Sequence, residues 1–269
     1  MTQSLDTLGE AIPFPPAARF SLNPKPGPPT RPAVRLDVLS VYMACMYGLY
    51  DRSLQSTTST TRQSDLLFHD LSSEVEPRPV LVIMPNRSLP PSSVAAQLNI
   101  WMLEGIVQRL KRFRRTMPLM VCELRQQPRN VPADMYGTIG AMAPQSQIAA
   151  RPDFPNVSIK YKSGAQPVDS RNVFLAAVKI FKRVAVEDKD AVVSMNWGFR
   201  VEDLELTFAT FPGRPRVLFW KELSEAAMAM VQFMRMSGSF KELKVSVLRD
   251  GAVIAIAELN AGGTDLIDI

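Results

Sequence analysis

Few residues in this chain are of the types that act as general bases or nucleophiles. His69 is the only histidine among 269 residues, and histidine is the side chain whose ordinary pKa suits proton transfer near neutral pH. It lies in a Ser- and Thr-rich stretch, residues 53–78, that shows no periodicity and no fixed orienting partner. We therefore interpret it as a loop histidine and not as part of a Ser/His/Asp set. Cys45 and Cys122 lie in apolar patterns, which indicates buried structural thiols that form no disulfide.

Metal and phosphate sites lack their usual residue patterns. Zinc sites need several Cys or His at short spacing, and the three such residues here lie far apart. Asp188 with Asp190, and Glu202 with Asp203, lack the dense oxygen ligands and the Gly turn of a cation loop. The glycines at positions 238, 262 and 263 do not follow a strand and open a helix, as a phosphate loop requires. We expect no catalytic residue, cofactor or metal, and carboxylate-based enzyme chemistry stays an open alternative.

The most concentrated charge is the segment RLKRFRR, which holds five cations separated by Leu110 and Phe113. The cations are Arg109, Lys111, Arg112, Arg114 and Arg115. The segment ends a predicted amphipathic helix, where the helix dipole favours each cation by about 0.3–1 kcal/mol, so a solvated helix end is one interpretation. The other is a binding site for phosphates or for an acidic partner, which the net charge of +5 permits. Nucleic-acid binding through residues 109–115 is therefore the second hypothesis for function.

The first 34 residues carry eight prolines, which restrict the backbone and remove hydrogen-bond donors. They predict an extended arm over residues 1–34 with one short strand near 19–22. Within the arm, Pro26, Pro29 and Arg31 match the P-x-x-P-x-Arg spacing that aromatic-lined peptide grooves bind. The alternative is a proline-rich spacer.

The rest of the chain predicts strands and helices in the order β-α-β-α-β-β, used twice. The first repeat, residues 35–143, has predicted helices at 35–52 and from Ser92 or Ser93 to near Arg114, and strands at 80–84, 119–124 and 135–142. A linker at 144–155 follows. The second repeat, residues 156–269, has predicted helices at 170–186 and 219–236, and strands at 157–161, 204–210, 243–248 and 252–259. Asp250-Gly251 predicts a two-residue turn between the last two strands. The fold class is α+β, two tandem pseudo-repeats with mostly antiparallel sheets and helices on one face.

The registers of the two repeats also correspond. An offset of 124 residues places Val80-Val82-Met84 on Leu204-Leu206-Phe208 and Leu119-Val121 on Leu243-Val245. For the first helix the offset is 135, which places Val38 on Val173. The sequence therefore predicts that these positions line equivalent faces of two related sheets.

Residues 170–259 carry a resemblance at the level of residue class. The segments are NVFLAAVKIFKRVA, DLELTF, ELSEAAMAMVQFM and KVSVLRDGAVIAIAEL. This succession of helix, alternating strand, helix and closing hairpin resembles an uncharacterised family of α+β proteins of filamentous fungi. The resemblance implies a fungal source and no functional residues.

Composition bounds the remaining possibilities. The chain is 46% hydrophobic and 21% charged, with apolar runs too short to cross a bilayer and no basic start followed by an apolar stretch. We expect an intracellular, cytoplasmic protein. The leading hypothesis is a non-enzymatic structural or protein-interaction protein that forms homo-oligomers through sheet edges, with itself or another protein as partner. The weakly charged strand 252–259 would serve if it lies at an edge.

Overall fold

A computed structural model describes residues 20–27, 34–55, 60–61, 66–69, 79–85, 94–126, 135–141, 157–194, 196–210 and 217–262. The chain divides into two compact units, one within residues 13–152 and one that contains all described elements from residue 153 onward. We call them the first and second repeat. The linker at 144–155 and the positions of Ser92, Ser93, Pro29 and Arg31 lie outside the described residues.

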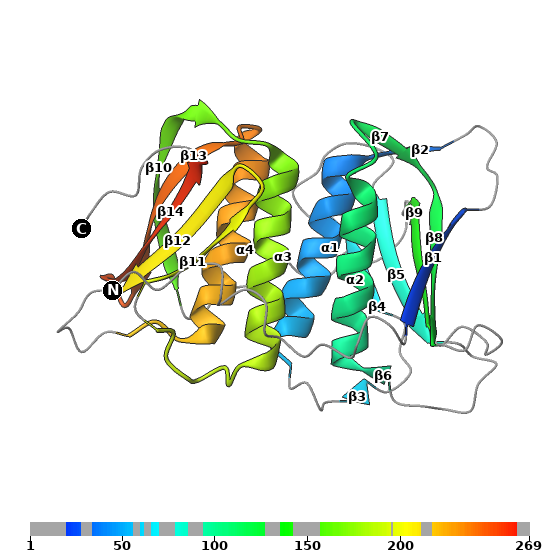
Figure 1. Ribbon diagram of the computed structural model, residues 1–269, viewed down its shortest axis with the longest axis horizontal. Helices are drawn as coiled ribbons and strands as arrows, with labels where there is room; N and C mark the ends of the chain where they lie inside the picture. Colours follow the sequence, from blue (N-terminus) through cyan, green and yellow to red (C-terminus); the bar gives the residue numbers. More distant parts are fainter. Residues whose placement is uncertain are drawn as a thin grey trace. The chain divides into compact units, whose positions relative to one another are not determined.

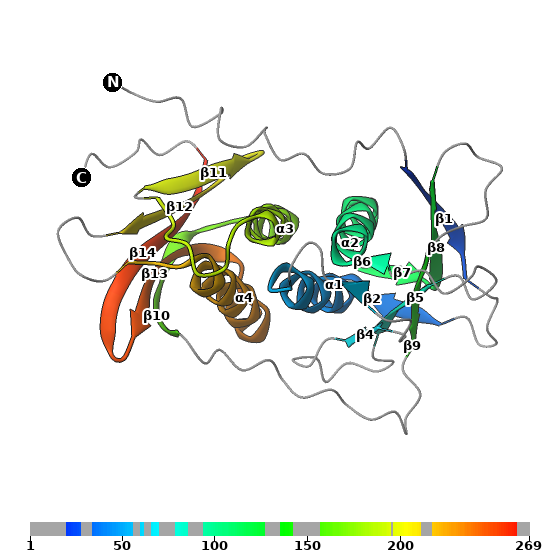
Figure 2. The same cartoon turned by 90° about the horizontal axis from the view of Figure 1, so that it is seen from below.

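The first repeat contains a five-stranded antiparallel sheet in the order β1-β8-β9-β5-β4, with α1 and α2 on one face (Figures 1 and 2). Two small two-stranded pairings, β2 with β7 and β3 with β6, accompany it. Its elements are β1 (Phe20–Pro26), β2 (Arg35–Asp37), α1 (Val38–Ser53), β3 (Thr60–Thr61), β4 (Leu66–His69), β5 (Pro79–Pro85), β6 (Val94–Ala95), α2 (Ala96–Leu110), β7 (Thr116–Pro118), β8 (Met120–Gln126) and β9 (Met135–Ala141).

The second repeat has the same architecture. Its five antiparallel strands follow the order β10-β13-β14-β12-β11, and α3 and α4 pack on one face (Figure 2). Its elements are β10 (Ser158–Pro167), α3 (Ser170–Val186), β11 (Trp197–Val201), β12 (Leu204–Thr210), α4 (Trp220–Ser237), β13 (Lys241–Arg249) and β14 (Ala252–Ala261).

The two sheets share one topology, because β1, β8, β9, β5 and β4 occupy the places of β10, β13, β14, β12 and β11. The predicted α+β duplication is therefore confirmed. The structure adds β4 and β11, so each repeat reads β-α-β-β-α-β-β.

Residues 20–26 of the predicted arm form β1, an edge strand of the first sheet, so the first repeat begins before residue 35. Helix α2 begins at Ala96, directly after β6, and not at an N-cap formed by Ser92 or Ser93.

The first helix of each repeat starts with an aspartate N-cap. The Asp37 carboxylate accepts a hydrogen bond from the Ser40 backbone N–H at 2.9 Å, and that of Asp169 accepts from the Arg171 N–H at 2.8 Å. Both caps satisfy backbone donors that a helix start leaves unpaired. These equivalent N-caps lie 132 positions apart, so the offset of 135 predicted from Val38 and Val173 is wrong.

The predicted strand register is wrong by one residue. In β12, Leu204, Leu206 and Phe208 are buried as expected. In β5 the least exposed side chains are Leu81 at 0% and Ile83 at 2%, which alternate with Val80 and the half-buried Val82. A one-residue slip exchanges the two faces of a strand, and the uniformly apolar sequence PVLVIMP has no alternation that would choose between them.

Strand β8 shows the same slip. Met120 and Cys122 are buried, whereas Leu119 and Val121 are half-buried. Through β9, Met120 aligns with Leu81 and Cys122 with Ile83, so one buried face runs across the three strands.

The closing turn of the second repeat is confirmed. Asp250 and Gly251 have φ values of 50° and 77°, the positive pair that a type I′ hairpin turn requires. At the far end of α4, Gly238 caps the helix in the left-handed conformation with φ 64°.

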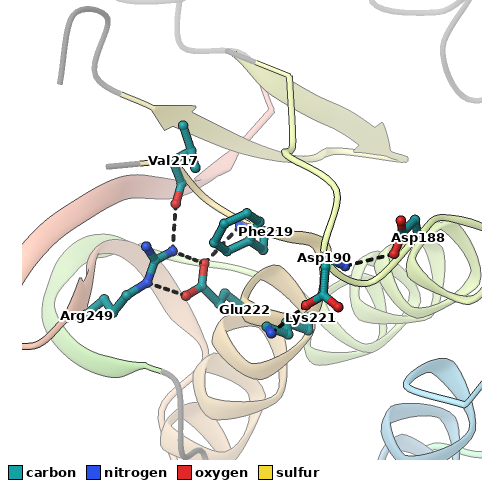
Figure 3. A network of polar contacts seen from close by, with 7 residues as sticks. All are labelled: Asp188, Asp190, Val217, Phe219, Lys221, Glu222 and Arg249. Atoms are coloured by element: carbon teal, nitrogen blue, oxygen red, sulfur yellow. Dashed lines mark hydrogen bonds and ion pairs between the residues drawn. The ribbon is translucent and has the colours of Figure 1, made fainter. Parts of the chain in front are cut away.

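A buried ion pair fixes the start of α4 to the hairpin of β13 and β14 (Figure 3). The Glu222 side chain is 2% exposed and accepts two hydrogen bonds from Arg249, each 2.5 Å long. It also accepts from the Phe219 backbone N–H at 2.9 Å, while Arg249 donates to the Val217 carbonyl at 2.7 Å. The nearby pair of Lys221 with Asp190 lies at the surface.

Candidate binding pocket

The basic segment 109–115 is a turn rather than a helix end. Helix α2 stops at Leu110, so only Arg109 lies in its last turn. The Arg112 and Phe113 N–H groups donate to the carbonyls of Arg109 and Leu110, which bends the chain away from the helix axis. Beyond the turn, Val38 N–H donates to the Arg115 carbonyl at 2.9 Å and β7 pairs with β2. The predicted helix to near Arg114 is therefore too long, and the turn is fixed at both ends.

A pocket of about 250 Å³ lies beside this turn. Its lining comes from β1, the end of α2, the turn, β7 and the start of β8. The lining residues are Lys25, Arg109, Arg112, Phe113, Pro118, Leu119 and Met120. The pocket thus combines an apolar surface with three cations, and none of the described residues that line it is acidic.

The edge strand β1 is held close to β8 at this point. Lys25 and Pro26 pair with Val121 and Met120, and the Gly27 N–H donates to the Leu119 carbonyl at 2.8 Å. A Cβ atom at Gly27 would stand 2.7 Å from the Leu119 Cβ, so only glycine permits this approach. The close contact sets the position of Leu119 in the pocket wall.

The two pocket arginines are not paired with a carboxylate in the described part of the chain. Arg109 and Arg112 form no ion pair with any other residue that the structure describes. Arg112 is exposed and Arg109 is half-buried at the pocket wall. A guanidinium group can bind an external carboxylate by donating charge-assisted hydrogen bonds to it.

The structure brings together part of the predicted site. Of the five predicted cations, Arg109 and Arg112 line the pocket, whereas Arg114 and Arg115 are exposed outside it and Lys111 is half-buried. Lys25 joins the site and was not predicted. Pro26 of the predicted peptide-groove ligand is the last residue of β1.

The two cysteines are free and buried, as predicted. Burial raises the pKa of the Cys122 thiol to about 12, although the positive charge of Arg109 opposes the shift. Burial also raises the pKa of Cys45, and the nearby Cys122 adds to that increase. Both thiols are therefore protonated at neutral pH, and a protonated thiol is a poor nucleophile.

His69 does not lie in an irregular loop. It is the last residue of β4 and is paired with Val80 of β5, so that expectation was wrong.

Within the described part of the chain, no group of three or more His, Cys, Asp or Glu side chains is arranged to hold a metal ion. None of the described helices is long and apolar enough to cross a membrane.

No protein-family model and no curated protein matches this sequence. Among solved structures, it is similar to crystal structures of the tandem DUF26 ectodomains of two cysteine-rich receptor-like proteins from Arabidopsis thaliana, PDLP8 and PDLP5. The identities are 10% and 11%, and the TM-scores are 0.24 and 0.23. The alignments cover 90% and 91% of this chain and 98% of each ectodomain. At these TM-scores neither likeness bears on function.

Proposed function

We propose that this chain is a non-enzymatic interaction protein whose first repeat binds an acidic segment of a partner protein. The observation that carries the proposal is the pocket beside the turn 111–115, in which Arg109, Arg112 and Lys25 surround an apolar wall. An acidic side chain next to an apolar one would meet both surfaces at once.

The size of the pocket favours a side chain over a whole small molecule. Ligand pockets for drug-sized molecules usually enclose about 300–1,000 Å³, and this one is about 250 Å³. Burying one large apolar side chain contributes about 1.5–3 kcal/mol. Charge-assisted hydrogen bonds to Arg109 and Arg112 would add orientation and specificity.

Nucleic-acid binding remains the alternative, because Arg114 and Arg115 are exposed and extend the positive surface beyond the pocket. If all five cations met phosphates of duplex DNA, the slope of log affinity against log salt would be roughly −4 to −5. The apolar pocket wall has no role in such a contact, and for that reason the peptide hypothesis is preferred.

The sheet topology changes which strands could mediate self-association. The strand expected at 252–259 is β14, which lies between β13 and β12 and has no free edge. The sheet edges are β1 and β4 in the first repeat, and β10 and β11 in the second. We propose that the chain self-associates through β1, β4 or β11, and a strict monomer by light scattering at micromolar concentrations would contradict this.

A peptide selection tests the main proposal. Random peptides displayed on phage are selected on the intact chain, and we expect the selected sequences to combine Asp or Glu with an adjacent aromatic or long aliphatic residue. Reversing both pocket arginines, Arg109→Glu with Arg112→Glu, should weaken the selected peptides by about 100-fold, because each lost charged hydrogen bond is worth roughly 1.5–3 kcal/mol.

The matched control is Arg114→Glu with Arg115→Glu, which makes the same charge change outside the pocket. It should weaken binding only a few-fold. Equal losses in the two variants, or selected peptides without acidic residues, would contradict the pocket. Tight binding of duplex DNA with the salt slope above would replace it with the nucleic-acid alternative.

A further inference from the structure

The edge strand β10 of the second repeat is long and exposed. It runs over ten residues, Ser158–Pro167, and every one except the half-buried Ile159 is exposed. On one side it pairs with β13 in a regular register from Ser158 to Ser163, before an irregularity that ends at Pro167. No described strand pairs with its other side. The regular stretch therefore presents outward-pointing N–H and C=O groups, which are able to pair with one more strand.

The two faces of this edge differ in chemistry. Ile159 and Tyr161 lie on the helix side of the sheet, opposite Val247 and Val245. Tyr161 stacks on Phe233 of α4 with ring centroids 3.5 Å apart, yet it stays 50% exposed. Lys160 and Lys162 lie on the opposite face, next to Ser246 and Lys244.

The edge lysines have no acidic partner among the described residues, whereas Lys244 is paired with Glu258 at 2.5 Å. A second copy of this chain is a poor match for the edge in any antiparallel register centred on residues 160–162. An antiparallel pair of β10 strands centred on Tyr161 would place Lys160 of each copy opposite Lys162 of the other. Centring the pair on either lysine would place that lysine opposite itself. Like charges directly opposite each other destabilise a strand pair.

We propose that β10 accepts, as a sixth strand of this sheet, an extended segment of another protein in which acidic and apolar residues alternate. The acidic residues lie opposite Lys160 and Lys162, and the apolar residues lie on the helix side against Ile159 and the exposed part of Tyr161. Backbone hydrogen bonds hold the segment, and the side-chain alternation sets its register. This site uses only second-repeat residues and does not depend on the pocket of the first repeat.

Fluorescence anisotropy tests the proposal with labelled eight-residue peptides and the full-length chain carrying Arg109→Glu with Arg112→Glu, which removes the acidic-peptide site proposed in the first repeat. A peptide that alternates glutamate with valine should bind, and one that alternates lysine with valine should not. The variant Lys160→Glu with Lys162→Glu should reverse this preference, with a loss of at least about tenfold for the glutamate peptide, since two attractive cross-strand pairs become repulsive. The substituted side chains are exposed, so the melting temperature should be unchanged.

Two controls separate strand pairing from general charge attraction. Arg114→Glu with Arg115→Glu makes the same net-charge change in the first repeat and should leave glutamate-peptide binding within about twofold, because neither arginine belongs to the proposed site. A glutamate–valine peptide with alternate backbone nitrogens methylated keeps its charge but cannot pair, so it should not bind. Equal binding of the methylated peptide, equal loss in the arginine control, or no binding by the chain in which Lys160 and Lys162 are intact would each overturn the proposal.

Discussion

The two repeats differ most where their second helix ends beside the first strand of the sheet. In the second repeat, α4 ends at Ser237 with Gly238 as a left-handed cap, and β10 places Tyr161 directly on Phe233. In the first repeat, α2 ends at Leu110, a basic turn follows, and a pocket of about 250 Å³ lies between the turn, β1 and β8. The corresponding end of the repeat thus carries a ring stack in one copy and a positively charged pocket in the other.

The two repeats share their architecture but differ in the surfaces that they present. The shared parts, the sheet order and the Asp caps of the first helices, fix the architecture of both copies. The pocket depends on features that the second repeat does not share, such as the turn at 111–115 and Lys25 on β1. The second repeat instead presents an edge strand with two exposed lysines. In the two proposals above, each repeat uses a different surface to bind an acidic partner.

The largest expected effect is on the stability of the second repeat, through the ion pair that joins α4 to the hairpin of β13 and β14. Glu222→Ala removes the buried carboxylate that binds Arg249 and the start of α4. Leaving the partly buried Arg249 without its partner should lower the free energy of unfolding by about 3 kcal/mol. Urea unfolding gives the size of the change, and hydrogen exchange shows whether it is confined to the second repeat.

The control for this prediction is Asp190→Asn, because its ion pair with Lys221 is at the surface, with the Asp190 side chain 74% exposed. An exposed pair is worth roughly 0–1 kcal/mol. If both substitutions change stability by the same amount, the Glu222 pair does not anchor α4.

The next prediction tests the close approach that forms the pocket wall. Gly27→Ala would place a Cβ atom 2.7 Å from the Leu119 Cβ, so the end of β1 must move away from β8. We expect a loss of about 1–3 kcal/mol in unfolding free energy, typical of overpacking, together with weaker binding of peptides selected on the pocket.

Gly238→Ala in the second repeat is the informative comparison. Apart from its own residue and its two chain neighbours, no atom lies within 4 Å of the added Cβ, so the cost comes from the left-handed backbone with φ 64°. That cost is roughly 1–2 kcal/mol, and peptide binding should be unaffected. If Gly27→Ala leaves binding unchanged as well, the position of β1 does not shape the pocket.

The same comparison shows what the sequence could predict. The bounds of α3 and β12 were predicted to the residue, because their apolar periodicity is clean and Asp169 marks the helix start. Strand β11 was missed because it has five residues and its turn contains Glu202 at φ 53°, a conformation for which glutamate gives no signal. Two pocket arginines were predicted from charge density alone. Lys25 was missed because it reaches the pocket through the pairing of β1 with β8, and the local sequence does not specify which strands pair.

The last expected effect separates the two repeats by the pH dependence of their stability, since both cysteines of the chain belong to the first repeat. The pKa of the Cys122 thiol is raised to about 12 by burial from a reference value of 9.0, and that of Cys45 is raised in the same direction. Above pH 9 the thiols ionise in the unfolded chain but not in the folded one. This contribution to stability is therefore complete below pH 9 and falls as the pH rises toward 12. At pH 10 the first repeat should lose roughly 1–3 kcal/mol for the two thiols together.

Hydrogen exchange after urea titration at pH 8 and at pH 10 measures this loss separately in the two repeats. The double variant Cys45→Ala with Cys122→Ala is less stable at both pH values, because it leaves small cavities, but its first repeat should lose the additional pH dependence. The difference between the two proteins isolates the thiols from lysines and tyrosines that also titrate in this range. If the first repeat of the double variant keeps the same pH dependence as in the unmodified chain, the buried thiols are not its cause. Alkaline pH would then not distinguish the first repeat from the second through its thiols.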